Sequence, residues 1–247
     1  MAAIQEIIAG NWKMNLTLSQ GREFIAELLP AVAKKNLSRK LLLAPNFTLL
    51  PVLAAACQGS EVELAAQNCS PQESGAFTGE TSVAMLKDAG AAYVLVGHSE
   101  RRQLFGESDA LLALKLKAVV AGGLRPILCV GETLEQRQAG AAVAVVTGQL
   151  TAALADYPGA QLIVAYEPVW AIGTGVTATP EDARLMHAEI RKFIQVKFPW
   201  GDTVPILYGG SAKPGNAAEL LAQPDVNGLL VGGAALDPES FLKIVTA

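Results

Sequence analysis

Short, continuously apolar runs alternate along the chain with longer segments that carry apolar side chains at helical spacing. Runs of this length, hydrophobic at nearly every position, are typical of strands buried on both faces. They predict eight strands, at residues 4–9, 41–44, 62–66, 92–96, 126–130, 162–166, 206–208 and 228–231. The segments between and after them predict eight helices, at residues 17–35, 49–57, 82–88, 109–121, 141–154, 180–198, 216–221 and 238–245.

Capping signals mark the ends of several of these helices. Thr17 and Gln20 have the spacing of a capping box at the first helix. Ser108 is placed to cap a helix that ends at the glycines 122 and 123. The sequence Thr179-Pro180-Glu181-Asp182 combines an N-cap, a proline at the first helical position and an acid three residues after the cap.

The order of these elements determines the fold class. Strand and helix alternate along all 247 residues, and no linker, repeat or shift of composition divides the chain. This order favours an α/β fold in which residues 1–247 form a single domain, a closed eight-stranded parallel (β/α)8 barrel, over two open sheets. In such barrels the chemistry is carried by residues that follow the strands directly.

Composition excludes several classes of protein. With 51% hydrophobic and 17% charged residues the chain can bury a large core, so disorder is not expected. The apolar runs are too short to cross a membrane, and the N-terminus lacks the basic region of an export signal. The net charge of -4 provides no basic field for nucleic acid.

The cysteines and histidines are sparse. Cys57, Cys69 and Cys129 are widely spaced and include no C-x-x-C pair, which is typical of reduced thiols in a cytoplasmic protein. His98 and His187 lie too far apart in sequence to suggest a histidine-rich metal site. We therefore expect a cytoplasmic protein without a metal ion.

The segment around Glu167 is the most informative stretch of the chain. The run that predicts the sixth strand ends at Tyr166, which places Glu167 at a strand tip. Pro168 and the following mixture of large apolar residues and glycines favour a mobile flap over another regular element. Taken alone, Glu167 would be read as a solvated carboxylate.

One competing motif falls in the same segment. Gly173, Gly175 and Ala178 have the G-x-G-x-x-A spacing of a dinucleotide-binding loop. That loop joins a strand directly to a helix and is followed about 20 residues later by an acid at a second strand end. Here residues 168–172 intervene, and the later position falls near Gln195 within a predicted helix, so a nicotinamide site is discarded.

Further polar residues and glycines follow other strands. Asn11 and Lys13 come after the first, and His98 comes after the fourth, although isolated residues of these types are more often surface or structural groups. The glycines 209–210 and 232–233 follow the last two strands, where barrels often bind phosphate through backbone amides. His187 lies in the middle of a predicted helix and is interpreted as non-catalytic.

Taken together these segments are similar to those of the triosephosphate isomerase family. The matching motifs are AGNWKMN at 9–15, GAFTGE at 75–80, GHSERR at 97–102, AYEPVWAIGTG at 165–175, YGGS at 208–211 and VGGA at 231–234. They occur in the same order and at the same strand ends, between residues 9 and 236.

The resemblance implies a TIM barrel and a role for each matching residue. Glu167 would be the general base, and Lys13 would neutralise the substrate's negative charge, with Asn11 positioning both. His98 would act as a neutral imidazole that polarises the substrate carbonyl from near a helix N-terminus, an arrangement of which this family is itself a standard example. Glu100 would support the site by pairing with Lys13.

The resemblance also implies how ligands and partners bind. Ser211, Gly232 and Gly233, with Gly173 of a closed lid, would offer N–H groups to a phosphate. The lid would protect an enediolate intermediate from losing that phosphate. Thr78, in the loop at residues 67–80, would reach the Asn11 region of a second subunit, which implies a homodimer.

The implied reaction interconverts dihydroxyacetone phosphate and D-glyceraldehyde 3-phosphate without a cofactor, as in glycolysis and gluconeogenesis. Gly215, Val176 and Ala235 depart from residues common in the family but remove no reacting group. Two alternatives stay open at this point: another phosphosugar barrel enzyme, or a non-catalytic protein that binds a phosphorylated metabolite.

Overall fold

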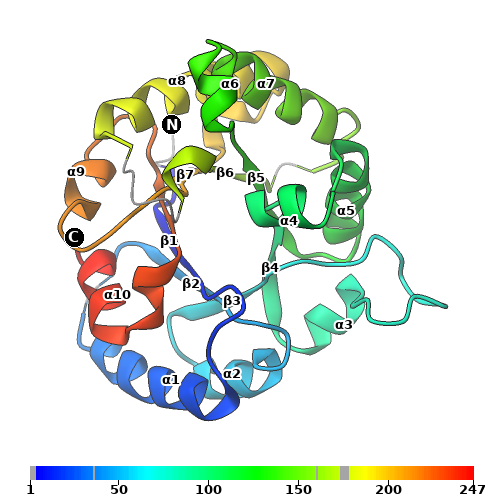
Figure 1. Ribbon diagram of the computed structural model, residues 1–247. Helices are drawn as coiled ribbons and strands as arrows, with labels where there is room; N and C mark the ends of the chain where they lie inside the picture. Colours follow the sequence, from blue (N-terminus) through cyan, green and yellow to red (C-terminus); the bar gives the residue numbers. More distant parts are fainter. Residues whose placement is uncertain (1–3, 36, 160, 173–177) are drawn as a thin grey trace.

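The eight strands of the computed structural model close into one parallel barrel in the order β1 to β8 (Figure 1). The structure describes residues 4–35, 37–159, 161–172 and 178–247. The strands are β1 Ile7–Asn11, β2 Lys40–Ala44, β3 Val62–Ala66, β4 Ala91–Val96, β5 Arg125–Val130, β6 Ile163–Tyr166, β7 Ile206–Tyr208 and β8 Gly228–Val231. The predicted fold class is confirmed.

Helices surround the barrel in the ring that Figure 1 shows. The α-helices are α1 Leu18–Ala33, α2 Leu50–Cys57, α3 Val83–Asp88, α4 Ser99–Leu104, α5 Asp109–Ala121, α6 Leu134–Gln138, α7 Ala142–Ala153, α8 Pro180–Lys197, α9 Ala217–Leu221 and α10 Pro238–Val245. Three short 3-10 helices, η1 Val169–Ala171, η2 Gly201–Thr203 and η3 Gly233–Leu236, lie in loops.

Two sequence predictions about these elements were wrong. The first strand is Ile7–Asn11 instead of residues 4–9, because its register begins where Ile7 pairs with both Lys40 and Gly228. The sequence analysis ended the strand before Gly10, yet Gly10 lies inside it. A glycine is required at this position because a Cβ there would lie 3.0 Å from the side chains of Ala235 and Phe241. The flap is also more regular than predicted, since η1 forms directly after Pro168.

The helix prediction was incomplete. Ten α-helices lie in the described residues against the eight that were given bounds: α4 is the short helix expected directly after His98, and α6 is additional. The sequence motif of α6 is a capping box, in which Thr133 N–H donates to Gln136 Oε1 at 2.9 Å and Gln136 N–H donates to Thr133 Oγ1 at 3.3 Å. At five residues, however, α6 is too short to show helical periodicity.

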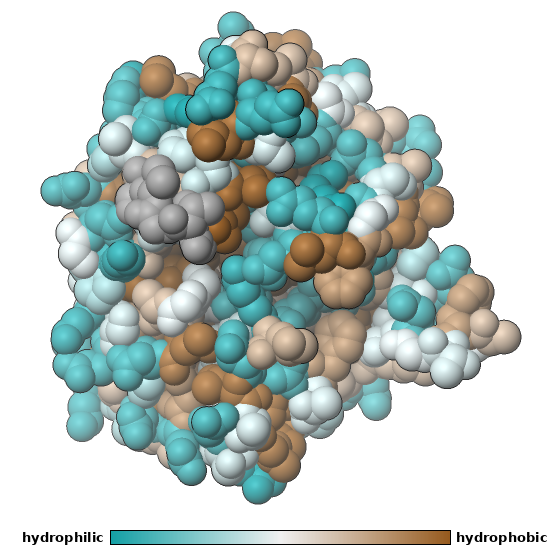
Figure 2. All heavy atoms as spheres, viewed as in Figure 1, coloured by the Kyte–Doolittle hydropathy of each residue, from teal (hydrophilic) through white to brown (hydrophobic). Residues whose placement is uncertain are grey.

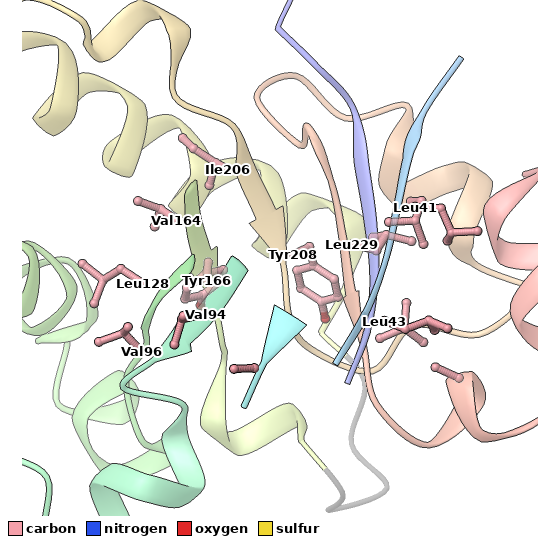
Figure 3. Packing of buried hydrophobic residues seen from close by; sticks show 14 of the residues in the cluster. Leu41, Leu43, Val94, Val96, Leu128, Val164, Tyr166, Ile206, Tyr208 and Leu229 are labelled. Carbon is pink, nitrogen blue, oxygen red and sulfur yellow. The ribbon is translucent and has the colours of Figure 1, made fainter. Parts of the chain in front are cut away.

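Alternation along each strand divides the core into two layers. In β4, Tyr93 and Leu95 belong to the cluster that fills the barrel, whereas Val94 and Val96 belong to the larger cluster between strands and helices. Figure 3 labels ten members of this outer layer, which come from β2 and β4 to β8. The period of two explains why the strands read as continuous apolar runs, since both faces are buried.

The predicted caps form where the sequence placed them. Ser108 Oγ accepts the Leu111 N–H at the start of α5, and Gly122 ends that helix. At α8 the Thr179 hydroxyl accepts the Asp182 N–H, while the Asp182 carboxylate accepts the Thr179 N–H. The Gln20 side chain likewise accepts the Thr17 N–H at 2.9 Å.

The segment between β3 and α3 is the long loop expected from the sequence. It contains no helix or strand, apart from a single bridge between Ser70 and Ser82. Figure 1 shows it projecting from the barrel farther than any other described loop. Because all eight strands are parallel, their carboxyl ends lie together at one end of the barrel.

Candidate active site

A cavity of about 260 Å³ lies at the carboxyl ends of the strands. Residues at the ends of β1, β4, β6, β7 and β8 and in the loops that follow them line it: Asn11, Lys13, His98, Glu167, Ile172, Gly209, Gly210, Ser211, Ala212, Lys213, Leu230, Gly232, Gly233 and Ala234. Seven of the residues predicted from the sequence meet here: Asn11, Lys13, His98, Glu167, Ser211, Gly232 and Gly233. Gly173, also predicted to bind substrate, and Val176, the departure noted in the lid, lie outside the described residues.

Glu167 is buried at the tip of β6, with 1% of its surface exposed. The Ser99 N–H donates a 2.7 Å hydrogen bond to its Oε2. Its Oε1 lies 3.1 Å from His98 Nε2, but not in hydrogen-bonding geometry, so Oε1 has no hydrogen-bond partner among the described residues. A carboxylate that lines a cavity, with one oxygen held and the other without a hydrogen-bond partner, is suited to taking up a proton.

Gly209 packs closely behind this carboxylate. Its N–H donates to the carbonyl of Tyr166 at 2.7 Å. A Cβ at this position would lie 3.0 Å from Glu167 Cγ and 3.2 Å from the Tyr166 carbonyl oxygen. The glycine after β7 therefore allows the base to lie against the neighbouring strand.

His98 forms the N-cap of α4 and is 6% exposed. The Glu100 N–H donates to its Nδ1 at 3.2 Å, so Nδ1 acts as an acceptor. In a neutral imidazole the proton is then on Nε2, the nitrogen that faces Glu167. From Nε2 the ring can therefore donate a hydrogen bond to a ligand in the cavity that both residues line.

Lys13 enters the cavity from a constrained backbone. Its φ of 52° is unusual for a residue with a side chain, and strain of this kind persists only where the surroundings enforce it. The Lys13 N–H donates to Asn11 Oδ1 at 3.0 Å, and Gln67 donates to the Lys13 carbonyl at 2.8 Å. The Lys13 ammonium donates to Glu100 Oε1 at 2.6 Å, which brings the two residues into the predicted pairing.

The two glycine loops lie on the cavity wall formed by β7 and β8. The short helix η3 begins at Gly233, so its first N–H groups lie beside the cavity. Lys13 Cε would be 3.6 Å from a Cβ on Gly232, which places the ammonium stem against this loop. Backbone N–H groups and a cation side by side are suited to holding a phosphate.

Sequence reasoning did not identify Glu132 or Lys213. The buried carboxylate of Glu132 accepts hydrogen bonds from Trp170 Nε1 at 2.8 Å and from the Tyr166 hydroxyl at 3.0 Å. Its position directly after β5 and Gly131 was the available signal. Lys213 is exposed and lines the cavity two residues after Ser211, and its cationic side chain beside the glycine loop was the corresponding signal.

Burial governs the other titratable groups near the base. Burial raises the pKa of the Cys129 thiol well above its usual value, and the adjacent Glu167 raises it further. Burial and Glu132 together raise the pKa of the Tyr166 hydroxyl, which therefore stays a hydrogen-bond donor. His187 is fully buried in α8 and does not line the cavity.

The remaining observations concern metals and membranes. In the described part of the chain, no group of three or more histidine, cysteine, aspartate or glutamate residues is arranged to hold a metal ion. None of the helices described is long and apolar enough to span a bilayer. Thr78 is exposed on the projecting loop, away from the cavity.

The barrel and the groups around its cavity are those of an enzyme equipped for acid–base chemistry on a small anion. The chain belongs to the triosephosphate isomerase family, since the profile described as "Triosephosphate isomerase" matches residues 6–247. The triosephosphate isomerase of Chloroflexus aurantiacus is 50% identical over 244 residues, which cover 97% of each chain. That of Aquifex aeolicus is 49% identical over 245 residues, or 98% of this chain and 99% of the relative.

A solved structure gives the same result. The crystal structure of triosephosphate isomerase from Bartonella henselae matches with a TM-score of 0.89 and 41% sequence identity. The match covers 98% of both chains. Fold and sequence thus agree on the family.

Proposed function

We propose that this protein interconverts dihydroxyacetone phosphate and D-glyceraldehyde 3-phosphate through an enediolate, without a cofactor. The observation that carries the proposal is the meeting of Glu167, His98 and Lys13 at one cavity that two glycine loops also line. Its volume of about 260 Å³ is below the roughly 300–1,000 Å³ of pockets for drug-sized ligands and suits a three-carbon phosphate. Membership of the family supports the same reaction.

The geometry gives each group a step in the reaction. Glu167 takes the proton from the carbon next to the carbonyl on its unpartnered Oε1, while the Ser99 N–H holds Oε2. His98 Nε2 donates to the carbonyl oxygen and moves the proton between the two oxygens of the enediolate. The Lys13 ammonium stabilises the negative charge that develops, an effect that is large where water is excluded.

Phosphate binding is assigned to the part of the cavity that the glycine loops line. Ser211, Gly232 and Gly233 line it with their backbone, and Gly173 is assigned the same role from the family resemblance alone. Asn11 fixes the backbone of Lys13 through its side-chain oxygen, and Glu100 holds the ammonium. The phosphate is thereby anchored while Glu167 and His98 act on the carbon end.

The test is isomerisation of D-glyceraldehyde 3-phosphate by the purified, chelator-treated protein, with Glu167→Gln beside it. We expect rapid turnover by the natural sequence and a loss of about 10²- to 10⁴-fold in kcat for Glu167→Gln, since the amide cannot accept the proton. Tight binding of phosphate ligands without turnover would identify a binder instead. Turnover untouched by Glu167→Gln would exclude the mechanism but not the activity.

We also propose that the protein is a homodimer in which Thr78 of one subunit reaches the Asn11 region of the other. The loop that carries Thr78 projects from the barrel. Large apolar side chains are exposed on this loop and on nearby segments, among them Met14, Phe77, Met85 and Phe105. Figure 2 shows hydrophobic surface beside α4, on the side of the molecule from which the loop projects.

A charged residue at the tip of the loop tests the dimer. Thr78→Arg would place a cation in the interface, so we expect monomers in sedimentation velocity and a fall in kcat. Lys213→Ala, which changes the charge of the chain away from this loop, serves as the control for the oligomeric state. A Thr78→Arg protein that sediments like the natural one would exclude this interface.

The protein's setting follows from the proposed reaction. We place it in the cytoplasm, in glycolysis and gluconeogenesis, as one barrel domain of residues 1–247 that binds neither nucleic acid nor membrane. Its three cysteines are all buried and unpaired, which suits a reducing compartment.

A further inference from the structure

A glutamine on the outer ring of helices is bonded to the backbone behind the proposed base. Gln149 of α7 accepts the Gly131 N–H on its Oε1 at 2.8 Å and donates from Nε2 to the Gly131 carbonyl at 3.0 Å. One N–H and the oxygen of the Gln149 side-chain amide thus bind the carbonyl and the N–H of the same residue, Gly131. These two hydrogen bonds fix both the orientation of the amide and the position of Gly131.

Gly131 belongs to the backbone that holds Glu167. Its neighbour Val130 accepts the Glu167 N–H at 2.7 Å, and its other neighbour, Glu132, accepts the Val169 N–H at 3.1 Å. A Cβ on Gly131 would overlap the carbonyl oxygen of Glu167, so the two backbones are in direct contact. A displacement of Gly131 is therefore passed to the residue that carries the base.

The turn that contains Gly131 borders a cavity. This second cavity, of about 160 Å³, is lined by Gly131, Gln149, Glu167 and Val169, together with Ser99, Arg102, Gln103, Val130, Thr133 and Gln136. Side chains therefore do not enclose the turn after β5 on every side. The two hydrogen bonds from Gln149 are the contacts among the described residues that tie Gly131 to a helix.

We propose that Gln149 is a positioning residue for the reaction, acting through Gly131 to hold the Glu167 carboxylate in line with the substrate carbon. This inference rests on the proposed role of Glu167. Gln149 does not line the substrate cavity and lies on a different element from the phosphate loops. Loss of its bonds should therefore change the rate of the chemical step and leave substrate binding nearly unchanged.

The first variant is Gln149→Met, which removes both hydrogen bonds and keeps a side chain of similar length. We expect kcat to fall about 10- to 100-fold, the size of effect that a small displacement of a reacting group produces, with KM within twofold of the natural value. The matched control is Gln103→Met. The side chain of Gln103 lines the same second cavity but makes no hydrogen bond to the residues described, so kcat should stay within twofold.

The second variant, Gln149→Glu, distinguishes positioning from stability. A protonated carboxyl group offers one acceptor and one donor and so reproduces both bonds to Gly131, whereas an ionised carboxylate only accepts. We expect the ratio of its kcat to that of the natural protein to rise as pH falls. The corresponding ratio for Gln149→Met should stay constant across the same pH range.

Each result either supports or contradicts the positioning role of Gln149. If Gln149→Met lowers the unfolding midpoint while kcat changes less than twofold, or if the Gln149→Glu ratio does not vary with pH, the positioning role is wrong. Should Gln149→Met fail to fold, the pH profile of Gln149→Glu still decides. Glu167→Gln, assayed in parallel, tests the proposed base independently, so failure of the one proposal is not mistaken for failure of the other.

Discussion

At the scale of single residues, His187 shows how burial determines the protonation state of a side chain. It is fully buried in α8, and its Nδ1 lies 3.0 Å from the Asp225 carbonyl oxygen. A carbonyl only accepts, so Nδ1 carries a proton. The pKa of His187 is lowered to about 4, chiefly by burial; Asp225 acts in the opposite direction, and the charge of Arg191 makes a smaller contribution to the lowering, so the ring is neutral near pH 7.

This protonation state predicts a pH dependence of stability. Between pH 6.5 and about 4 the unfolded chain binds a proton at His187 that the folded chain does not, so the free energy of unfolding falls as pH drops. The slope contributed by one such group is at most about 1.4 kcal/mol per pH unit. His187→Asn keeps a donor for the Asp225 carbonyl but cannot titrate, so its stability should fall less steeply over this range.

Urea unfolding of both proteins at several pH values from 6.5 to 4 measures the difference. The absolute stability of His187→Asn is expected to be lower, since the smaller side chain leaves space in the core. Only the slope tests the argument. Parallel curves for the two proteins would show that His187 has the same protonation state in the folded and unfolded chains.

At the scale of elements, backbone conformation separates two glycines that otherwise look alike. Gly148 lies inside α7, and Gly140 lies just before it with a φ of +72°. A Cβ at either position would meet no atom within 4 Å. Any difference between alanine substitutions at the two sites therefore reflects backbone conformation and not packing.

Gly148→Ala should stabilise the protein by about 0.5–1 kcal/mol, because alanine loses less backbone freedom in a helix. Gly140→Ala should destabilise it by about 1 kcal/mol or more, because a side chain disfavours positive φ. Denaturant midpoints at constant slope measure both. Isomerase activity at saturating substrate should be equal in the two variants, and equal shifts of the midpoint would contradict the prediction.

The elements also show what was accessible from the sequence. Buried strands in a parallel barrel are apolar on both faces, and a cap such as Thr179 is local, so strand order and most helix starts could be predicted. The helix α6 was missed, although the capping box of Thr133 and Gln136 marked its start. The end of the first strand was misplaced because Gly10 is required by close packing against α10 and η3, which only the folded chain reveals.

The residues of the site likewise include some that the sequence could predict and others that it could not. Because a closed parallel barrel brings all strand tips together, residues that follow strands were predictable as a set that shares one cavity. Contacts between loops were not: Ser99 binds Glu167 across 68 positions of sequence. Gln149 was missed because nothing local marks a helix residue that binds a distant turn.

At the scale of the whole molecule, the barrel depends on how β7, β8 and β1 join. In the register, β7 and β8 share one residue pair, Tyr208 with Leu229, whereas β8 and β1 share four. Asn227, just before β8, bridges both sides: its N–H donates to the Ile206 carbonyl at 2.8 Å, and its carbonyl accepts the Ile7 N–H at 3.0 Å. The Arg191 guanidinium donates to the Asn227 side chain at 2.8 Å and fixes its position.

Gly228, the first residue of β8, allows this closure because it has no side chain. Its φ of +144° is one that other residues rarely adopt, and a Cβ would overlap the carbonyl oxygen of Ile7. Gly228→Ala should therefore destabilise the protein by at least about 2 kcal/mol, the sum of backbone strain and a clash with β1 that cannot relax without separating the strands. Gly215→Ala, where a Cβ would meet nothing within 4 Å, is the control and should change the unfolding midpoint little.

The consequence for activity follows from where the site is built. Lys13 follows β1, Ser211 follows β7 and Gly232 follows β8. The pairing of β7, β8 and β1 therefore places the Lys13 ammonium beside the glycine loops. Separating β8 from β1 should raise KM for the phosphorylated substrate in Gly228→Ala even under conditions in which circular dichroism shows the helices intact. If Gly228→Ala instead unfolds at the natural midpoint and binds substrate normally, β1 and β8 tolerate a side chain between them, and the barrel's closure must rest on the other strand pairs.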